Sequence, residues 1–198
     1  MDIEALNRAA FVAINASANT PAAWLVFGKA AAETSIFVLA GLLLVAWVRA
    51  GSGIRRALVH TAIAIPAALA LNYVIGQCFP HPRPFMVGLG HTFLPHAAEP
   101  GFPSDHATVM WTLAFGLLLR PATWGLGLAA ACLAILTSWG RVFLGLHFPL
   151  DVLGSAAVAA AVIAALAPLR SLVERKIAGP IEKLYWRACA HAKRHIDW

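Results

Sequence analysis

The chain has 198 residues, of which 60% are hydrophobic and only 12% are charged, with a mean hydropathy of +0.73. Because a soluble domain carries about 25% charged residues, this composition excludes an ordinary soluble protein and predicts an integral membrane protein with one folded domain. The formal net charge of +6 does not indicate nucleic-acid binding, because most basic residues fall in short predicted loops and the tail.

The N-terminal segment predicts a helix that lies on the membrane surface. Ile3, Leu6, Ala10, Ile14 and Ser17 form a mostly apolar stripe at helical spacing. The stretch is too short and too polar to cross a bilayer, so we expect residues 1–20 to form an amphipathic interfacial helix. Because the features of a cleavable signal peptide are missing, we expect the first span to direct insertion.

Two apolar spans follow, at about residues 23–48 and 57–78. The first contains Lys29 and Glu33 at i and i+4, a spacing that favours a local ion pair. A basic, glycine-containing turn over residues 49–56 separates the two spans. Pro66 predicts a kink in the second one, which neighbouring helices can accommodate.

Residues 79–104 predict a polar loop, because six prolines forbid a regular helix there. His81, His91 and His96 crowd into this loop. Such a concentration outside the spans suggests a site, although plain surface histidines are an alternative. The three residues lack the spacing of metal ligands, as do the chain's cysteines, and we predict no metal site.

Three more spans are predicted at about residues 104–119, 122–139 and 151–166, and a basic, helical tail at residues 169–198. The predicted fold class is therefore all-α: an integral membrane helical bundle of about five transmembrane helices, flanked by the interfacial helix and the tail. Alanine and glycine dominate the last two spans, which predicts a tightly packed bundle.

The basic residues predict the orientation in the membrane. One side holds 11 of the 15 Lys and Arg and the other side holds 4, and the positive-inside rule makes the richer side cytoplasmic. The cytoplasmic set comprises Arg49, Arg55, Arg56, Arg120, Arg170, Arg175, Lys176, Lys183, Arg187, Lys193 and Arg194. The loops around Arg83, Ser104 and His147 then face outward together.

The segment from Arg141 to Asp151 carries the strongest chemical signal. In helical geometry, His147 and Asp151 at i and i+4 share a face, and a carboxylate beside an imidazole fixes its tautomer and stabilises its charged form. Arg141 adds a planar cation that suits phosphate. The alternative interpretation is a structural His–Asp pair near a helix start.

Two further clusters share the outward face: His81-Pro-Arg83-Pro84, and Pro103-Ser104-Asp105-His106. Ser104 stands where a span begins and can cap that helix, whose free N–H groups attract anions. Two arginines and a helix N-terminus describe a phosphate cradle, and two histidines supply one nucleophile and one general acid. The set predicts phosphoryl transfer.

The three clusters together resemble the signature of the type 2 phosphatidic acid phosphatase (PAP2) superfamily, most closely its bacterial undecaprenyl-diphosphate phosphatase branch. The likeness covers about residues 20–168, and we expect residues 21–168 to form the catalytic domain. It implies that His147 is the nucleophile, that Asp151 orients it and that His106 protonates the leaving group. It also implies that Arg83, Ser104 and Arg141 hold the phosphate, and that neither a metal nor another cofactor is needed.

Two positions depart from that signature. Gly76 stands where the family usually has a lysine, and Asp105 where it usually has a glycine. A carboxylate beside the phosphate should repel an anion unless it is paired. We hypothesise that Lys29 supplies the missing charge or that Glu33 positions a catalytic group; an interfacial ion pair away from the site is the alternative. His81 is a further candidate supporting residue.

The resemblance implies an enzyme of the bacterial cytoplasmic (inner) membrane that hydrolyses an isoprenoid lipid diphosphate at the outer, periplasmic face through a phosphohistidine. Other PAP2 activities are alternatives: phosphatidylglycerophosphate or phosphatidate hydrolysis, or phosphate transfer to lipid A. From another class, a transporter or proton-relay protein is disfavoured because the last three spans have no mid-span ionisable residue. We expect the membrane and the lipid, not nucleic acid, as partners; a homo-oligomer stays open.

Overall fold

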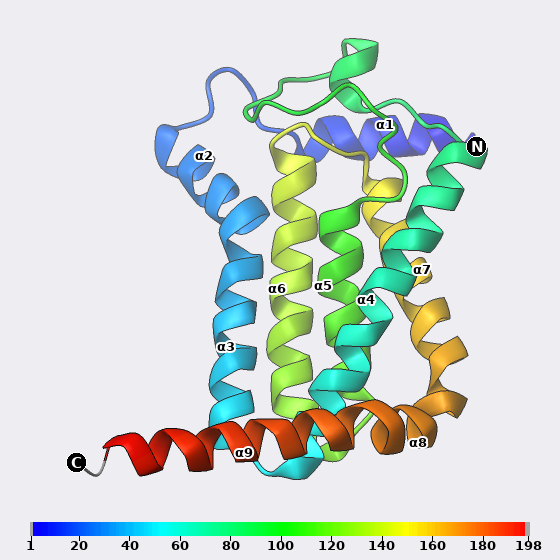
Figure 1. The fold of residues 1–198 in the computed structure, drawn as a ribbon. Coiled ribbons are helices and arrows are strands. Elements are labelled where there is room, and N and C mark those ends of the chain that lie inside the picture. The colour runs from blue at the N-terminus through cyan, green and yellow to red at the C-terminus, as the bar shows by residue number, and fades with distance from the viewer. Residues whose placement is uncertain (1, 197–198) are drawn as a thin grey trace.

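A computed structural model describes residues 2–196 and shows a bundle of long helices with one helix lying across each end (Figure 1). No strand occurs in this range. The α-helices are α1 (Ile3–Ile14), α2 (Ala22–Lys29), α3 (Ser35–Arg49), α4 (Ser52–Cys78), α5 (Asp105–Leu118), α6 (Trp124–Phe143), α7 (Pro149–Leu166), α8 (Arg170–Val173) and α9 (Gly179–Ile196). Short π and 3-10 turns lie between them: η1 (Ala30–Thr34), η2 (Pro84–Val87), η3 (Pro121–Thr123), η4 (Ala167–Leu169) and η5 (Glu174–Ala178).

Four helical segments of the described chain are long and apolar enough to span a membrane: Ala22–Arg49, Ser52–Cys78, Pro121–Phe143 and Pro149–His191. The remaining predicted span, α5, has 14 residues and is about 21 Å long, shorter than a bilayer core of about 30 Å. It nevertheless runs within the bundle beside α4 and α6 (Figure 1). The predicted all-helical membrane bundle is confirmed.

Close helix packing depends on small residues at specific contacts. A Cβ atom added at Gly140 of α6 would lie 2.8 Å from the backbone nitrogen of Ala32 and 2.9 Å from the carbonyl oxygen of Gly28. No side chain fits there, so the backbone of η1 lies directly on α6.

Two predicted boundaries are wrong. α4 begins at Ser52, so the turn before it is confined to Ala50 and Gly51. α6 continues to Phe143, which places Arg141 in the last turn of that helix instead of in a loop. The helix ends only before Gly145, whose φ of +81° belongs to the left-handed region and whose Cβ position would lie 2.1 Å from the carbonyl oxygen of His91.

Of the apolar stripe, Ile14 packs on the bundle, but the buried contacts of α1 are made by residues that the stripe does not include. Phe11 is fully buried with its ring centroid 5.3 Å from that of Phe148. Asn7 is also buried, and its Oδ1 accepts a hydrogen bond of 3.0 Å from the backbone N–H of Leu150. Ile3 and Leu6 of the stripe are exposed.

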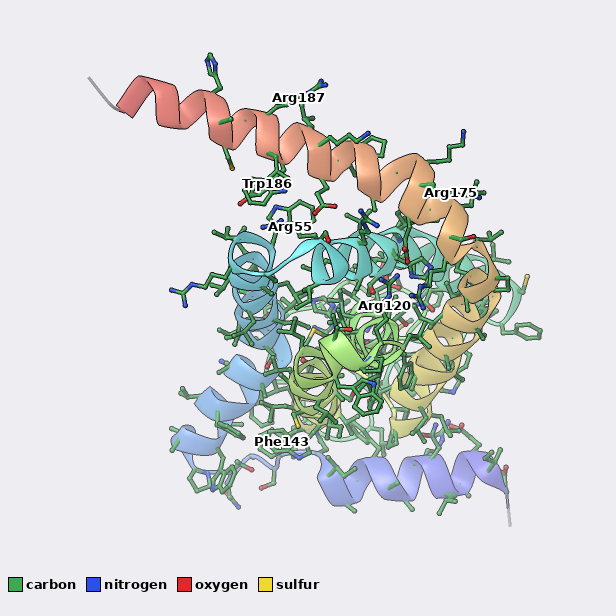
Figure 2. The ribbon with its side chains drawn as sticks, turned by 90° about the horizontal axis from the view of Figure 1, so that it is seen from below. Arg55, Arg120, Phe143, Arg175, Trp186 and Arg187 are labelled. Atoms are coloured by element: carbon green, nitrogen blue, oxygen red, sulfur yellow. The ribbon has the colours of Figure 1, made fainter. Side chains whose placement is uncertain are left out.

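The C-terminal helices α8 and α9 lie across the opposite end of the bundle (Figure 2). The Arg55 guanidinium lies 4.8 Å from the Tyr185 ring centroid and 4.7 Å from that of Trp186. Arg55 also pairs with Glu182 at 3.7 Å, and Arg120 pairs with Glu174. The predicted tail is thus a docked helix, and its residues 197 and 198 lie outside the described part.

Candidate active site

The three predicted clusters converge at the α1 end of the bundle, around one cavity of about 370 Å³. Arg83, Asp105, His106, Arg141 and His147 all line it. Ser104 is fully buried beside it, and Asp151 lies fully buried behind His147. The cavity is also lined by residues that were not predicted as site residues, namely Asn72, Tyr73, Gln77, His96 and Glu99.

The His147–Asp151 contact is present, although its geometry differs from the predicted one. His147 belongs to the loop before α7, while Asp151 lies in the first turn of that helix. The Nδ1 atom of His147 is 3.3 Å from Oδ2 of Asp151, and the same oxygen accepts a hydrogen bond of 2.8 Å from the N–H of Phe148. The carboxylate therefore fixes both the ring and the loop that carries it.

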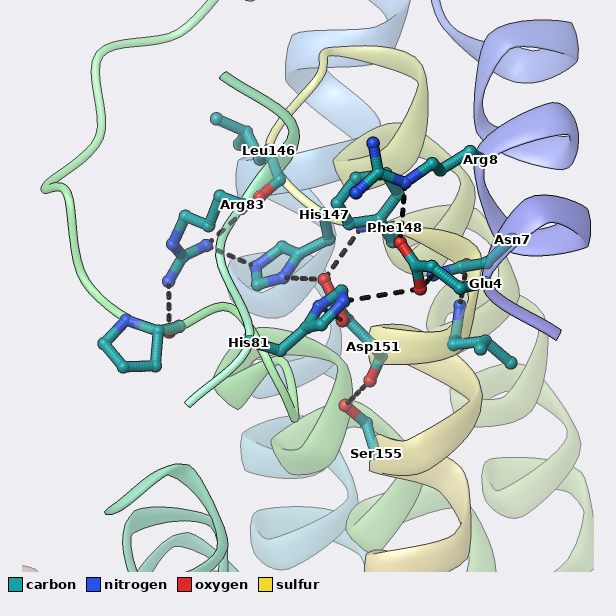
Figure 3. A network of polar contacts seen from close by, with 12 residues as sticks. Glu4, Asn7, Arg8, His81, Arg83, Leu146, His147, Phe148, Asp151 and Ser155 are labelled. Carbon is teal, nitrogen blue, oxygen red and sulfur yellow. Dashed lines mark hydrogen bonds and ion pairs between the residues drawn. The ribbon is translucent and has the colours of Figure 1, made fainter. Parts of the chain in front are cut away.

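Arg83 determines the tautomer of His147 (Figure 3). Its Nη1 donates to the Leu146 carbonyl at 3.2 Å and lies 2.9 Å from Nε2 of His147. Because a guanidinium can only donate, Nε2 must be the accepting nitrogen, and the ring proton must lie on Nδ1, where it faces Asp151. The lone pair of Nε2 therefore points toward the cation-lined side of the ring.

His147 is neutral at physiological pH. Complete burial is the main cause that lowers its pKa from 6.5 to about 4; the Asp151 hydrogen bond opposes this shift and the positive charge of Arg83 adds to it. A neutral imidazole with a fixed Nδ1 proton carries an unprotonated electron pair on Nε2, which can attack phosphorus once Arg83 donates to the phosphate instead.

Ser104 stands at the N-cap position of α5, yet its side chain makes no capping hydrogen bond. Its backbone is fixed instead: the N–H donates to the Asp151 carbonyl at 3.3 Å, and the carbonyl accepts from the Ser155 hydroxyl at 2.9 Å. The predicted side-chain cap is therefore wrong. Within residues 2–196, the buried Oγ of Ser104 and the Nε of Arg141 have no hydrogen-bond partner, and a bound anion would satisfy both donors.

Asp105, which stands where the family usually has a glycine, is paired by a hydrogen bond, so its carboxylate is not left unpaired beside the phosphate site. Its Oδ1 accepts a hydrogen bond of 2.9 Å from Nδ2 of Asn72, which also contacts Oγ1 of Thr108 at 2.9 Å. Asn72 is buried within α4. A polar residue inside an apolar span is the sequence signal that could have identified it.

In the described chain, Lys29 and Glu33 do not form the expected ion pair, although the charge of Glu33 acts on Arg141. Both side chains are exposed, neither lines the cavity, and they form no ion pair in the described part of the chain. The two residues lie where α2 changes into the π turn η1, a change of helix geometry that the prediction from α-helical spacing did not include. Gly76 does line the cavity, and a Cβ atom there would be 3.5 Å from the Phe102 carbonyl, so its position is open.

His96 and His81 lie on different sides of the nucleophile. Nε2 of His96 is 3.1 Å from Nη2 of Arg141. His81 lies behind Asp151, and Nδ1 of His81 is 3.5 Å from Oδ1 of the carboxylate. Sequence reasoning noted the loop histidines but could not separate these two positions from that of His91, which is exposed.

A helical membrane bundle in which two arginines surround a neutral, carboxylate-held histidine is suited to phosphoryl transfer. Residues 57–174 match the model of the PAP2 superfamily, and the chain belongs to this phosphatase superfamily.

Comparisons with individual proteins support the same family assignment. The chain is 38% identical over 153 residues to the Escherichia coli protein named "Putative undecaprenyl-diphosphatase YbjG", covering 77% of this chain and 76% of that one. It is 35% identical over 127 residues to the undecaprenyl-diphosphatase BcrC of Bacillus subtilis, covering 64% and 65%. The crystal structure of Aquifex aeolicus LpxE superposes with a TM-score of 0.64 at 25% identity, covering 83% of this chain and 97% of that one. The protein is therefore a lipid phosphatase of the membrane.

Proposed function

We propose that this protein hydrolyses undecaprenyl diphosphate to the monophosphate through a phosphohistidine on His147. The observation that carries the proposal is the 2.9 Å contact between Arg83 and Nε2 of His147, which places an unprotonated nucleophile beside a phosphate-binding cation. The choice of lipid is supported by the names of the two relatives with 38% and 35% identity.

In the proposed first step, Nε2 of His147 attacks the terminal phosphorus and forms an N–P bond. The bond from phosphorus to the bridging oxygen breaks, and its electron pair stays on that oxygen. Asp151 stabilises the positive charge that develops on the ring. Arg83, Arg141 and the free hydroxyl of Ser104 neutralise and orient the terminal phosphate, supported by the N-terminus of α5.

We assign to His106 the role of general acid, which protonates the leaving group. His106 lies in the first turn of α5 and lines the same cavity as His147. The negative charge of the bound diphosphate favours the protonated form of His106. We propose that His106, protonated in the substrate complex, donates this proton to the bridging oxygen, so that undecaprenyl monophosphate leaves as a stable product. It then accepts a proton from the water molecule that attacks the phosphohistidine, which releases inorganic phosphate and restores neutral His147. No metal or cofactor enters these steps.

We assign the active site to the periplasmic face of the cytoplasmic membrane. The cavity lies at the α1 end, whereas Arg55, Arg120, Arg175 and Arg187 lie at the opposite end (Figure 2). The positive-inside rule favours a cytoplasmic location for the arginine-rich end. Residues 21–168 then form the catalytic domain, with α1 on its outer end and α8 and α9 on its inner end.

The experiment is phosphate release by the purified protein from a panel of lipid phosphates and diphosphates without added metal. We expect undecaprenyl diphosphate to give the highest kcat/KM, and His147→Ala to abolish turnover while the thermal unfolding transition is retained. Preference for phosphatidylglycerophosphate or phosphatidate would contradict the substrate assignment. Near-normal activity of His147→Ala would contradict the mechanism.

A further inference from the structure

Asp151 has a second set of contacts on the side that faces away from His147. A second cavity, of about 520 Å³, lies on that side, and Glu4, His81 and Asp151 line it. Asp151 is fully buried and so separates the two cavities. A hydrogen bond to its second oxygen, Oδ1, would therefore affect the carboxylate that orients His147.

Two buried polar atoms face each other at this position. Oδ1 of Asp151 and Nδ1 of His81 both lack a hydrogen bond within residues 2–196, and they lie 3.5 Å apart. An unsatisfied buried polar group is unfavourable, and a small approach of the two atoms would satisfy both. Such a hydrogen bond requires a proton on Nδ1 of His81, because the carboxylate can only accept.

The other ring nitrogen of His81 faces the N-terminal helix. Its Nε2 is 3.5 Å from Oε2 of Glu4. Glu4 is itself held within α1 by Arg8 at 2.8 Å and by Asn7 at 3.4 Å. Figure 3 shows His81 between the two carboxylates. An imidazole between two acceptors satisfies both of them only when both nitrogens carry protons.

Aromatic packing also fixes the position of the His81 ring. Its centroid lies 5.4 Å from that of Phe148, the residue directly after the nucleophile, and Phe148 packs on Phe11 of α1. The charged and titratable groups around the ring are therefore Glu4 and Arg8 from α1 and Asp151 from α7, with His147 and Arg83 beyond Asp151.

We propose that His81 and Glu4 are positioning residues for the reaction: Glu4 of the N-terminal helix orients His81, and His81 holds Asp151 in the position that aligns His147. The chain Glu4–His81–Asp151–His147 makes α1 part of the active site. This inference rests on the proposed function, since it assumes attack by His147.

The two amide replacements of histidine separate the two contacts. The side-chain nitrogen of asparagine can occupy the place of Nδ1, whereas that of glutamine can reach the place of Nε2. We therefore expect His81→Asn to retain kcat within about threefold of wild type, and His81→Gln to lower kcat by about tenfold or more with KM changed less than about twofold. The matched control is His91→Gln, a change of the same type in the same loop at an exposed residue.

Glu4→Gln tests the link to α1. We expect a smaller loss of kcat than for His81→Gln, and we expect the double variant Glu4→Gln/His81→Gln to be no slower than His81→Gln alone, because residues acting in series are not additive. The pH profile gives a second readout. A hydrogen bond from Nδ1 of His81 to Oδ1 draws negative charge away from the oxygen that faces His147, so its loss should move the acid limb of kcat/KM to higher pH.

Each outcome decides the question. Three results would each overturn the proposal: an unchanged kcat and acid limb in His81→Gln, a greater loss of kcat in His81→Asn than in His81→Gln, or additive losses of kcat in the double variant. A loss of thermal stability that accounts for the lost activity of both His81 variants would also overturn it, because it would mean a purely structural role. An active His147→Ala would refute the proposed function itself, whereas an inactive His147→Ala with a fully active His81→Gln would refute this inference alone.

Discussion

The charge of Asp151 should supply a large part of the catalytic effect, and Asp151→Asn tests this directly. Oδ2 of Asp151 accepts from the Phe148 N–H at 2.8 Å, so the amide oxygen must take that position and the amide NH2 must point toward His81. The variant therefore keeps the hydrogen bond that fixes the loop, and it loses the charge together with the acceptor that faces His81.

The magnitude follows from the 3.3 Å separation of Nδ1 of His147 from Oδ2. A unit charge pair at this distance interacts by about 5 kcal/mol at an effective dielectric constant of about 20. At about 1.36 kcal/mol per factor of ten, the loss corresponds to a decrease in kcat of about 10³- to 10⁴-fold, the range found when the aspartate of a Ser-His-Asp triad is neutralised.

The assay is steady-state phosphate release from the lipid diphosphate in detergent micelles, together with thermal unfolding. Asp2→Asn is the matched control, because Asp2 makes a local contact with the Glu4 N–H at the start of α1 and should give wild-type rates. A kcat of Asp151→Asn within tenfold of wild type, with an intact unfolding transition, would refute the electrostatic role of the carboxylate.

Four further outcomes are expected. EDTA should leave phosphate release unchanged, because two guanidinium groups and a helix N-terminus supply the positive charge; loss of activity that Mg²⁺ restores would contradict this mechanism. In a cysteine-free variant, a cysteine at exposed Val87 should react with an impermeant thiol reagent in intact cells and one at exposed Lys183 should not, whereas reversed labelling would place the site in the cytoplasm. The acid limb of kcat/KM should lie below the ordinary histidine pKa of about 6.5, since burial lowers the pKa of His147 to about 4 and the neutral form attacks; a limb at or above 6.5 would contradict the assigned form. Lys29→Ala and Glu33→Gln should change kcat/KM by less than about twofold, as both side chains lie outside the cavity lining, and a tenfold loss would restore the hypothesis that they serve the site.

The sequence was sufficient to predict the fold class and five of the residues that line the cavity: Arg83, Asp105, His106, Arg141 and His147. Hydropathy marked the long helices, and ionisable residues next to apolar spans are rare enough to indicate function. Spacing alone also brought His147 and Asp151 together, although the contact is made from a loop and not along a helix. The contact was predicted correctly because Asp151 follows His147 by only four residues. That separation keeps the two side chains close even though His147 lies in the loop before α7.

Features that depend on packing between distant segments could not be predicted. The π turn η1 changes which residues share a face, and hydropathy gives no sign of it. Asn7 and Phe11 dock α1 on the bundle, but a helix with several apolar residues can bury more than one face. The pairing of Asn72 with Asp105 joins residues 33 positions apart, and only the register of α4 against α5 creates it.

That register also explains where the cavity lies. α5 is 14 residues long and α4 is 27 residues long, so the two helices cannot end at the same level on both sides of the bundle. Asn72 bonds to the first residue of α5 and lies six residues before the end of α4, which leaves about 9 Å of α4 extending beyond the start of α5. Gly76 lies on this extending part and lines the cavity. The N-terminus of α5, with Ser104 and His106, therefore forms the floor of a recess, and the Pro-rich loop over residues 79–104 covers it with Arg83. A short central helix between longer neighbours thus creates the space in which the cations and both histidines meet.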